Sequence, residues 1–589
     1  MRLHSRLIET VGLSSFILSQ PVWSLGNTPC PILGAYYPAP TTLASSDFVE
    51  NATVNAETQI REGLDNGQLD GNTTTLSIEV YSLHNDSPLF TFHNTPELLG
   101  SQRKTGVTTV DSNTVYRIGS VSKLWTAYLY LITAGDSSWG RPVTDFVPEL
   151  AAIVQDRKAF DDKFDHVSWE TITVGALASH LAGIGRDASW SSSLATRFQS
   201  LGLPDQGGNS NSNCGDANRE MLPSFFHDFS RQHPISTPFY TPVYSNAGYQ
   251  ILAYALENIT GRQLCDTFEK RLVKPLGLQG TYYDTPPTTN TSIIPFNKTF
   301  SWWDFDYRGK TPAAGYYSTT NDMSLVGKAI LNSTFLSLAQ THRWLKPHAF
   351  TSNPDTAVGA PWEILRAPGS PVSWIYAKSG DAGLYSSMVM LIPDLDVGIS
   401  VLAAGMDATN QVLVASDVLA NTFVPAFWAE AKQQTATAYA GTYMDHKSNT
   451  TITIAAAADT APGLVLSEFT LGGQDLLQEL ISLIGTNVTL HLYHMGLTAK
   501  GDNNTTIDSW RAVFETSSAI SSSSSSSCVS WLLLNPYLYG GVGLDEFLFT
   551  LDSTFQNALA IESRIAGVEV QKQGDRLSGT GKLWKMSST

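Results

Sequence analysis

Positive charge is scarce in this chain of 589 residues. Lys and Arg together number 36 against 53 Asp and Glu, which gives a formal net charge of −17. Nucleic acids and anionic membrane surfaces select for basic patches, so this charge balance argues against both as partners. Hydrophobic residues make up 42% of the chain, as in a packed globular protein. The length exceeds what one hydrophobic core normally supports, so we expect two domains.

Cysteine and long apolar stretches are also rare. The four cysteines match no C-x-x-C pattern, which argues against a zinc ribbon or a redox motif. His227 and His233 share no metal-ligand spacing, so we expect no metal and no cofactor. Past the N-terminus, no stretch reaches the ~20 apolar residues of a membrane span. We therefore predict no membrane span, and the sequence leaves the oligomeric state open.

The N-terminus has the features of a secretion signal over residues 1–24. Arg2 and Arg6 precede a short apolar stretch, and Val22 and Ser24 occupy the −3 and −1 positions of a cleavage site. Sequons for N-glycosylation also indicate export to the extracellular space. These predicted glycosylation sites are Asn51, Asn72, Asn85, Asn258, Asn290, Asn297, Asn332, Asn449, Asn487, Asn503 and Asn504.

An exported chain with four cysteines permits two disulfides in three possible connectivities. We favour Cys214 with Cys265, which both lie in the catalytic region, and Cys30 with Cys528. The other two connectivities remain open at this point.

The chain divides near residue 433. Alternating strands at 76–81 and 89–92, a hairpin over 386–403 with its turn at Pro393, and helical patterns between them predict a mixed antiparallel sheet flanked by helices over residues 25–432. A helix from about Ala408 to Ala431, with a kink at Pro425, closes this domain. Residues 433–589 contain short β-prone runs and predict a separate β-rich domain of lipocalin-like size.

Two short motifs occur twice, so only their context separates the functional copy from the other. Ser-x-x-Lys stands at Ser120–Lys123 and at Ser101–Lys104. The first copy opens an apolar helix, which places an amine beside the hydroxyl that it activates, one turn earlier. Lys-[Ser/Thr]-Gly stands at 378–380 and at 104–106, and only the former follows a strand. Context therefore selects Ser120, Lys123 and the 378–380 copy.

Tyr244-Ser-Asn246 is the third motif, in a turn that leads into a helix over 251–256. The three motifs, in this order, resemble the signatures of the serine β-lactamase and penicillin-binding protein (DD-peptidase) family. Tyr at the second motif is similar to the class C branch and its esterase relatives. The resemblance covers about Leu76 to Ala431, and implies the α/β (α+β) β-lactamase/transpeptidase-like fold with an all-helical subdomain.

This resemblance implies a role for each matching residue. Ser120 would be the nucleophile, Lys123 would accept its proton, and Tyr244 would share the base role and protonate the leaving group. Asn246 would orient Lys123 and the substrate. The remaining predicted substrate-binding residues are Lys378, for positive potential; Ser379, for a substrate carboxylate; Gly380; and Asp381, whose backbone N–H would complete an oxyanion hole with that of Ser120.

Asp381 departs from the family pattern, because relatives often carry a small residue there. Its carboxylate puts recognition of β-lactams and D-Ala-D-Ala peptides in doubt. We interpret His180 as a structural residue. The sequence thus predicts a secreted serine hydrolase that acts on the ester, amide or lactam carbonyl of a small or peptide-like acyl substrate. An acyltransferase with the same acyl-enzyme and a non-catalytic binding protein are the alternatives.

Overall fold

The structure is a computed structural model that describes residues 31–574 except 35, 98–104, 157–163, 188–224, 227–228, 230–231, 368–370, 458–461, 485–487 and 517–529. The chain forms two compact units. One comprises residues 41–368 and 373–427, and the other comprises residues 1–40, 369–372 and 428–589. The predicted pairs Cys214–Cys265 and Cys30–Cys528 each include a residue outside the described part, so both disulfides stay predictions.

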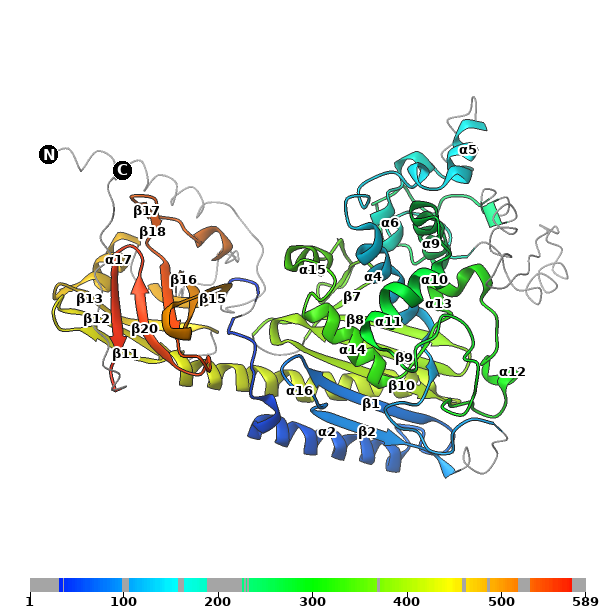
Figure 1. Ribbon diagram of the computed structural model, residues 1–589, viewed down its shortest axis with the longest axis horizontal. Helices are drawn as coiled ribbons and strands as arrows, with labels where there is room; N and C mark the ends of the chain where they lie inside the picture. The colour runs from blue at the N-terminus through cyan, green and yellow to red at the C-terminus, as the bar shows by residue number, and fades with distance from the viewer. Residues whose placement is uncertain are drawn as a thin grey trace. The chain divides into compact units, whose positions relative to one another are not determined.

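The first unit is built on an eight-stranded antiparallel sheet in the described chain, with the order β2-β1-β10-β9-β8-β7-β6-β5 (Figure 1). The predicted hairpin is present, since β9 pairs with β10 around Pro393. The strands are β1 (Thr75–Ser82), β2 (Phe90–Asn94), β5 (Ala349–Phe350), β6 (Thr356–Val358), β7 (Glu363–Arg366), β8 (Trp374–Ala382), β9 (Tyr385–Ile392) and β10 (Val397–Ala404).

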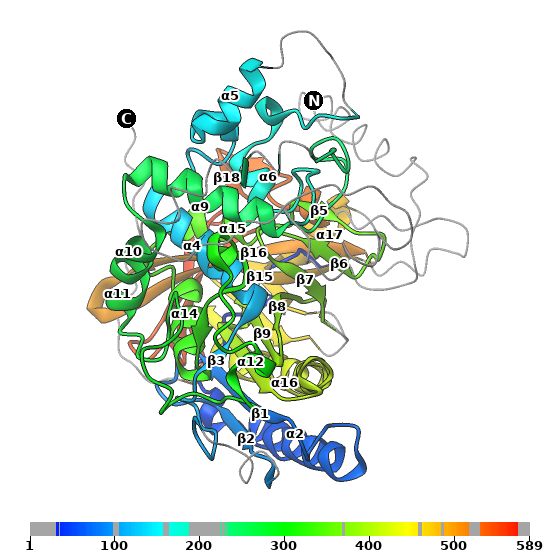
Figure 2. The same cartoon turned by 90° about the vertical axis from the view of Figure 1, so that its right-hand side faces the viewer.

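Helices cover both faces of this sheet (Figures 1 and 2). On one face, Arg61 of α2 (Asp47–Asn66) lies over the ring of Phe92, and Phe423 of α16 (Ala408–Tyr439) packs at 5.7 Å from Phe90. Side chains alternate between faces along a strand, so Tyr81 of β1 points to the other face. There Gly327 of α14 (Thr320–Leu331) accommodates the Tyr81 ring.

The remaining helices lie on the α14 side and in the helical region around α9. One of them, α4, is buried on every side from Ser122 to Ile132, as an apolar helix through a core must be. They are α4 (Ser122–Ala134), α5 (Pro148–Asp156), α6 (Val174–Ala178), α9 (Asn246–Thr260), α10 (Leu264–Phe268), α11 (Lys274–Leu276), α12 (Lys298–Ser301), α13 (Thr311–Ala314) and α15 (Leu338–Trp344). The short strand β3 (Tyr116–Arg117) precedes α4 and pairs with β4 (Tyr317–Ser318), which follows α13.

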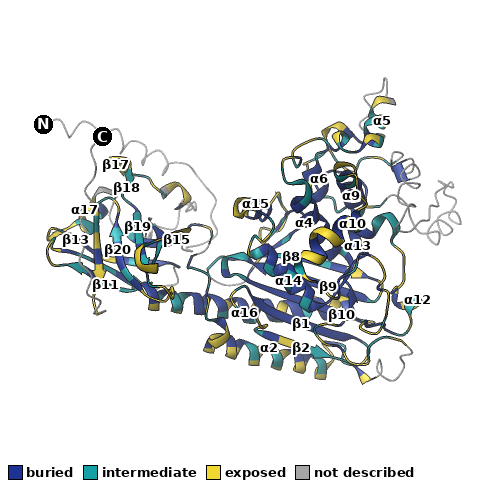
Figure 3. Ribbon diagram, viewed as in Figure 1, coloured by how far each residue is buried: buried dark blue, intermediate teal, exposed yellow. Residues whose placement is uncertain are grey.

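The second unit is a β-barrel, because β12 pairs with β13 and closes the ring β12-β11-β21-β20-β19-β16-β15-β13. Aromatic and aliphatic side chains form its core, and the strands of this unit alternate between buried and more exposed residues (Figure 3). The elements are β11 (Gly441–Asp445), β12 (Thr450–Ala456), β13 (Leu464–Leu471), β14 (Gln474–Asp475), α17 (Leu476–Ile484), β15 (Val488–Lys500), β16 (Thr506–Thr516), β17 (Leu538–Tyr539), β18 (Val542–Gly543), β19 (Glu546–Leu551), β20 (Ala558–Ser563) and β21 (Val568–Lys572). The separate β-rich domain is thereby confirmed.

The helix α16 is longer than predicted. It continues through Pro425 and past Ala431 to Tyr439, whose hydroxyl donates to the buried carboxylate of Asp508 at 2.8 Å. This tertiary contact, absent from the local sequence pattern, fixes the last turns of the helix. By length and composition α16 is also apolar enough to cross a membrane, although half of its most apolar window is buried inside the protein. The absence of a membrane span therefore stays a prediction.

Candidate active site

The turn before α4 presents Ser120. Gly119 has a φ of +47° and is the first residue of the short 3-10 turn Gly119–Val121. This turn leads directly into α4. Ser122 secures this turn, because its hydroxyl donates to the Gly119 carbonyl at 2.7 Å and accepts the Tyr316 N–H at 3.0 Å. Ser120 is half-buried, one turn before Lys123.

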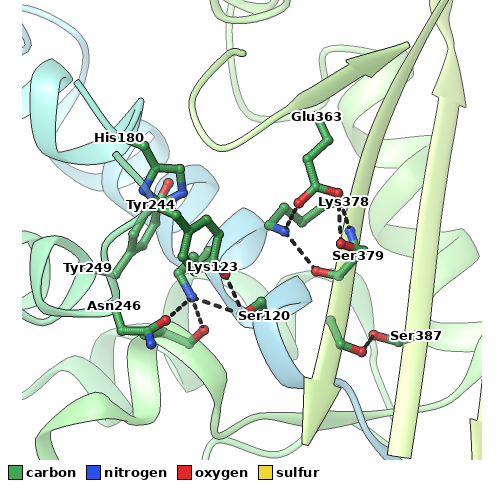
Figure 4. Close-up of polar contacts among 12 residues, drawn as sticks. Ser120, Lys123, His180, Tyr244, Asn246, Tyr249, Glu363, Lys378, Ser379 and Ser387 are labelled. Carbon is green, nitrogen blue, oxygen red and sulfur yellow. Dashed lines mark hydrogen bonds and ion pairs between the residues drawn. The ribbon is translucent and has the colours of Figure 1, made fainter. Parts of the chain in front are cut away.

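Lys123 is completely buried, and its Nζ has three polar neighbours (Figure 4). The Nζ lies 3.1 Å from Ser120 Oγ, 2.7 Å from Asn246 Oδ1 and 2.8 Å from the Ala313 carbonyl. Burial, and then the positive charge of Lys378, lowers the pKa of Lys123 well below its usual 10.5. A larger share of Lys123 is therefore neutral near pH 7 than of an exposed lysine.

Tyr244 is the second group in contact with Ser120. Its hydroxyl donates to Ser120 Oγ at 2.6 Å. Three cations surround its ring: Lys123 Nζ at 4.7 Å, the Arg186 guanidinium at 4.8 Å and Lys378 Nζ at 5.5 Å from the centroid. The predicted convergence of a hydroxyl, two amines and a phenol is thus present.

His180 positions the loop that carries Tyr244. Its ring stacks on the Tyr244 ring with 4.5 Å between centroids, and its Nδ1 accepts the Ser245 N–H at 3.1 Å. An accepting Nδ1 places the ring proton on Nε2. Burial, and then the charges of Lys123, Lys378 and Arg186, hold the pKa of His180 well below its usual 6.5. The interpretation of His180 as structural fits these contacts.

Asn246 connects Lys123 to a carboxylate that the motif search did not identify. Its Nδ2 lies 3.2 and 3.3 Å from the two carboxylate oxygens of Asp187, which directs its Oδ1 towards Lys123. Lys310 Nζ in turn lies 3.1 Å from Asp187 Oδ1. Asp187 carries no motif of its own, so no local sequence signal identifies it.

Gly119 and Gly380 bring the Ser120 turn against β8. A Cβ on Gly380 would lie 2.5 Å from the Ser120 nitrogen, and a Cβ on Gly119 would lie 2.5 Å from the Asp381 nitrogen. Only glycines permit this contact between the two backbone segments. The two N–H groups predicted to form an oxyanion hole therefore belong to segments in direct contact.

Lys378 and Ser379 share a partner that the sequence did not reveal (Figure 4). Glu363, on the neighbouring strand β7, forms an ion pair with Lys378 Nζ. Its other carboxylate oxygen accepts the Ser379 N–H at 2.9 Å and the Ser379 hydroxyl at 2.8 Å. The family resemblance implies that the Ser379 hydroxyl binds a substrate carboxylate. In this structure that hydroxyl is already hydrogen-bonded to the carboxylate of Glu363.

Asp381 lies at the exposed end of β8, where its carboxylate accepts a hydrogen bond from the Thr409 hydroxyl at 2.7 Å. Across the part of the chain that is described, no group of three His, Cys, Asp or Glu side chains is arranged to hold a metal ion. The second Ser-x-x-Lys copy, at Ser101, falls in the range 98–104 and lies outside the described residues.

Comparison with known proteins identifies the family. The family model described as Beta-lactamase matches residues 83–421, which is more than half of the chain. The chain belongs to the β-lactamase family. A second family model, described as the C-terminal domain of β-lactamase-like proteins, matches residues 431–574 of this β-lactamase-family chain. The predicted family and fold are confirmed.

Fungal proteins are among its relatives. A β-lactamase-like protein of Arthroderma benhamiae is 27% identical over 587 residues, covering 92% of this chain and 94% of the relative. The probable hydrolase clz13 of Cochliobolus lunatus is 24% identical and covers 83% of each chain. A solved class C β-lactamase matches with a TM-score of 0.44 at 17% identity, covering 63% of this chain and 95% of its own.

The neutral state of His180 predicts a pH-dependent stability in this β-lactamase-family protein. The unfolded chain protonates this ring below about pH 6.5, whereas the folded chain resists protonation, so stability is complete above that pH and falls below it. When the pH is lowered from about 7.5 to about 5.5, protonation of His180 in the unfolded chain would lower the free energy of unfolding by up to about 1.4 kcal/mol. Urea unfolding of wild type and His180→Gln at both pH values measures this share.

The exposed His446 provides the matched control, since His446→Gln should leave the pH dependence unchanged. Equal pH dependence in wild type and His180→Gln would contradict a neutral, buried His180.

Proposed function

We propose that this protein is a serine hydrolase that acylates Ser120 and transfers the acyl group to water. The observation that carries the proposal is the position of Ser120 Oγ, which lies 3.1 Å from Lys123 Nζ and 2.6 Å from the Tyr244 hydroxyl. A nucleophile held within hydrogen-bond reach of its base is the arrangement that acyl transfer requires. Membership of the β-lactamase family and relatives named as hydrolases support it.

The neighbours of Lys123 accommodate a neutral amine. The Asn246 Oδ1 and Ala313 carbonyl oxygens can only accept hydrogen bonds, while the Ser120 hydroxyl can also donate one. A neutral amine has two N–H donors for the two carbonyls and one lone pair for the hydroxyl proton. All three contacts are then satisfied, with the Ser120 proton aimed at the base.

The chemistry follows from this arrangement. As Ser120 Oγ attacks the substrate carbonyl, its proton passes to Lys123, and the backbone N–H groups of Ser120 and Asp381 stabilise the negative charge on the carbonyl oxygen. Tyr244 donates a proton to the leaving group as the bond to it breaks, and Lys123 restores the Tyr244 proton. Water then attacks the acyl-enzyme by the same steps in reverse.

We further propose that the protein is secreted and glycosylated. The signal-like residues 1–24 lie outside the described part of the chain. The sequon asparagines that the structure describes are exposed, apart from the half-buried Asn85, so glycans would meet no steric obstacle.

Ser120→Ala should lower kcat/KM for an activated ester at least about a thousandfold, because no other group replaces the nucleophile. The second copy of the motif supplies the control, since Ser101→Ala should retain wild-type turnover. Steady-state hydrolysis of a p-nitrophenyl ester, with thermal unfolding to verify folding, gives both values. Wild-type turnover by Ser120→Ala would refute the proposed nucleophile.

The pH profile should report Lys123. The base form exists above the pKa of Lys123, so kcat/KM should rise with pH and level off well below the usual lysine value of 10.5. Because the charge of Lys378 lowers this pKa, Lys378→Gln should move the rise to higher pH. The exposed Lys270 is the control, and Lys270→Gln should leave the profile in place. An unmoved rise in Lys378→Gln would contradict this coupling.

Export predicts N-linked glycans. When the full chain is secreted from a eukaryotic host, treatment with a peptide N-glycosidase should lower its mass by several glycans, as intact-mass spectrometry would show. The same chain made in the bacterial cytoplasm should keep its mass. Retention of the protein inside the eukaryotic cell, with no mass change, would exclude this part of the proposal.

A further inference from the structure

The carboxylate of Glu363 occupies the polar groups beside the nucleophile that a substrate anion would need. One oxygen of Glu363 pairs with Lys378 Nζ, and the other accepts from both the N–H and the hydroxyl of Ser379. The Lys378 Nζ also donates to the Ser379 carbonyl at 2.8 Å. Lys378 is 1% exposed, so little of its charge faces solvent.

The other cation beside Tyr244 at the surface is also paired. Arg186 lies 3.9 Å from Asp187 Oδ2, and Lys310 Nζ lies 3.1 Å from Asp187 Oδ1. Of the basic groups around the Tyr244 ring, Lys378 is thus held in an ion pair with Glu363, and Arg186 lies within 4 Å of Asp187. A substrate carboxylate placed beside Ser379 would lose water and would find Lys378 and Ser379 already bonded to Glu363.

The strand that carries Ser379 adds a second negative charge. Side chains two residues apart share one face of a strand, so Asp381 follows Ser379 on the same face of β8 at a spacing of about 7 Å. Its carboxylate is exposed and is bonded to the neutral hydroxyl of Thr409. An anionic substrate along this edge would therefore approach the Asp381 charge as well as that of Glu363.

Apolar surface lies where β8 ends. A Cβ on Gly383 would lie 2.5 Å from the Trp302 Cβ, so Trp302 packs directly on this end of the strand. Trp302 and Phe305 stack with 4.8 Å between ring centroids, and each is 45% exposed. Exposed stacked aromatics offer contact area to an uncharged, apolar group.

From these four observations we propose that the site takes uncharged esters or amides, and that Glu363 is the specificity-determining residue that excludes acyl donors with a carboxylate near the scissile bond. The inference rests on the proposed hydrolase function. The Glu363 carboxylate would occupy the position that a substrate carboxylate would otherwise take. Its negative charge would also repel a substrate carboxylate nearby.

A matched pair of phenyl esters tests this inference. The two esters share one acyl group and differ only at the meta position of the leaving phenol, which carries a carboxylate in one and a carboxamide in the other. Each kcat/KM is divided by the rate of hydroxide-catalysed hydrolysis to remove the intrinsic difference. Wild type should prefer the carboxamide ester at least about tenfold, since like charges in contact are strongly disfavoured. Glu363→Gln should move this ratio at least about tenfold towards the carboxylate ester.

Asp355→Asn is the control, because it removes an exposed carboxylate paired with Arg366 of β7, away from Lys378. It should keep the wild-type ratio. Gln retains an oxygen that accepts from Ser379, and thermal unfolding verifies the fold. Should the variant fail to fold, the wild-type ratio decides, and an equal rate for both esters overturns the inference.

The results also separate this inference from the proposed function. Hydrolysis that depends on Ser120, with a ratio unaltered by Glu363→Gln, overturns the role of Glu363 alone. A wild-type protein that turns over neither ester and forms no adduct on Ser120 overturns both.

Discussion

A buried amine that hydrogen-bonds a hydroxyl is the interaction on which the site depends. Lys123 has no exposed surface, so its charged form loses hydration that the protein does not fully replace. The helix α4 imposes this burial, because it runs through the core and is buried on all sides. Ser120 stands one turn earlier, where Gly119 and Ser122 fix the backbone. Core packing and base strength are therefore set by the same helix.

The surrounding residues act mainly on this amine. Lys378 contributes positive charge that disfavours a second cation, and Asn246 provides an acceptor whose direction Asp187 fixes. His180 supports the Tyr244 ring by stacking and receives a backbone N–H. These residues and their partners come from β7, β8, the start of α9 and residues 180–187. Their convergence depends on the tertiary fold as a whole.

The sequence was sufficient for the parts of the site that have a local signature. Helical periodicity after Ser120 and the strand before Lys378 predicted two residues that the structure brings to one site. Glu363 could not be predicted, because its place beside Ser379 follows from the register of β7 on β8, which pairs Glu363 with Ala377. Asp187 likewise depends on a loop that returns to Asn246. The end of α16 was placed too early for a related reason, since Tyr439 is fixed by Asp508 in the barrel.

The family alone does not determine the substrate. The β-lactamase fold supplies the hydroxyl, the amines and the phenol, whereas Glu363 and Asp381 alter the charge along the edge of β8. These carboxylates lie beside the contacts among Ser120, Lys123 and Tyr244, which we propose to be catalytic, without replacing any of them. The same fold can therefore keep its acyl-transfer chemistry while the anion preference of the site changes.

The charge state of Lys123 is the most direct test of this account. The protein can be labelled with lysine carrying 13C at Cε, and the Lys123 resonance assigned by its loss in Lys123→Met. Titration followed by NMR should show Lys123 losing its proton well below the usual lysine value of about 10.5. A Lys123 that keeps its proton up to the usual lysine value of about 10.5 would contradict the neutral base on which the account relies.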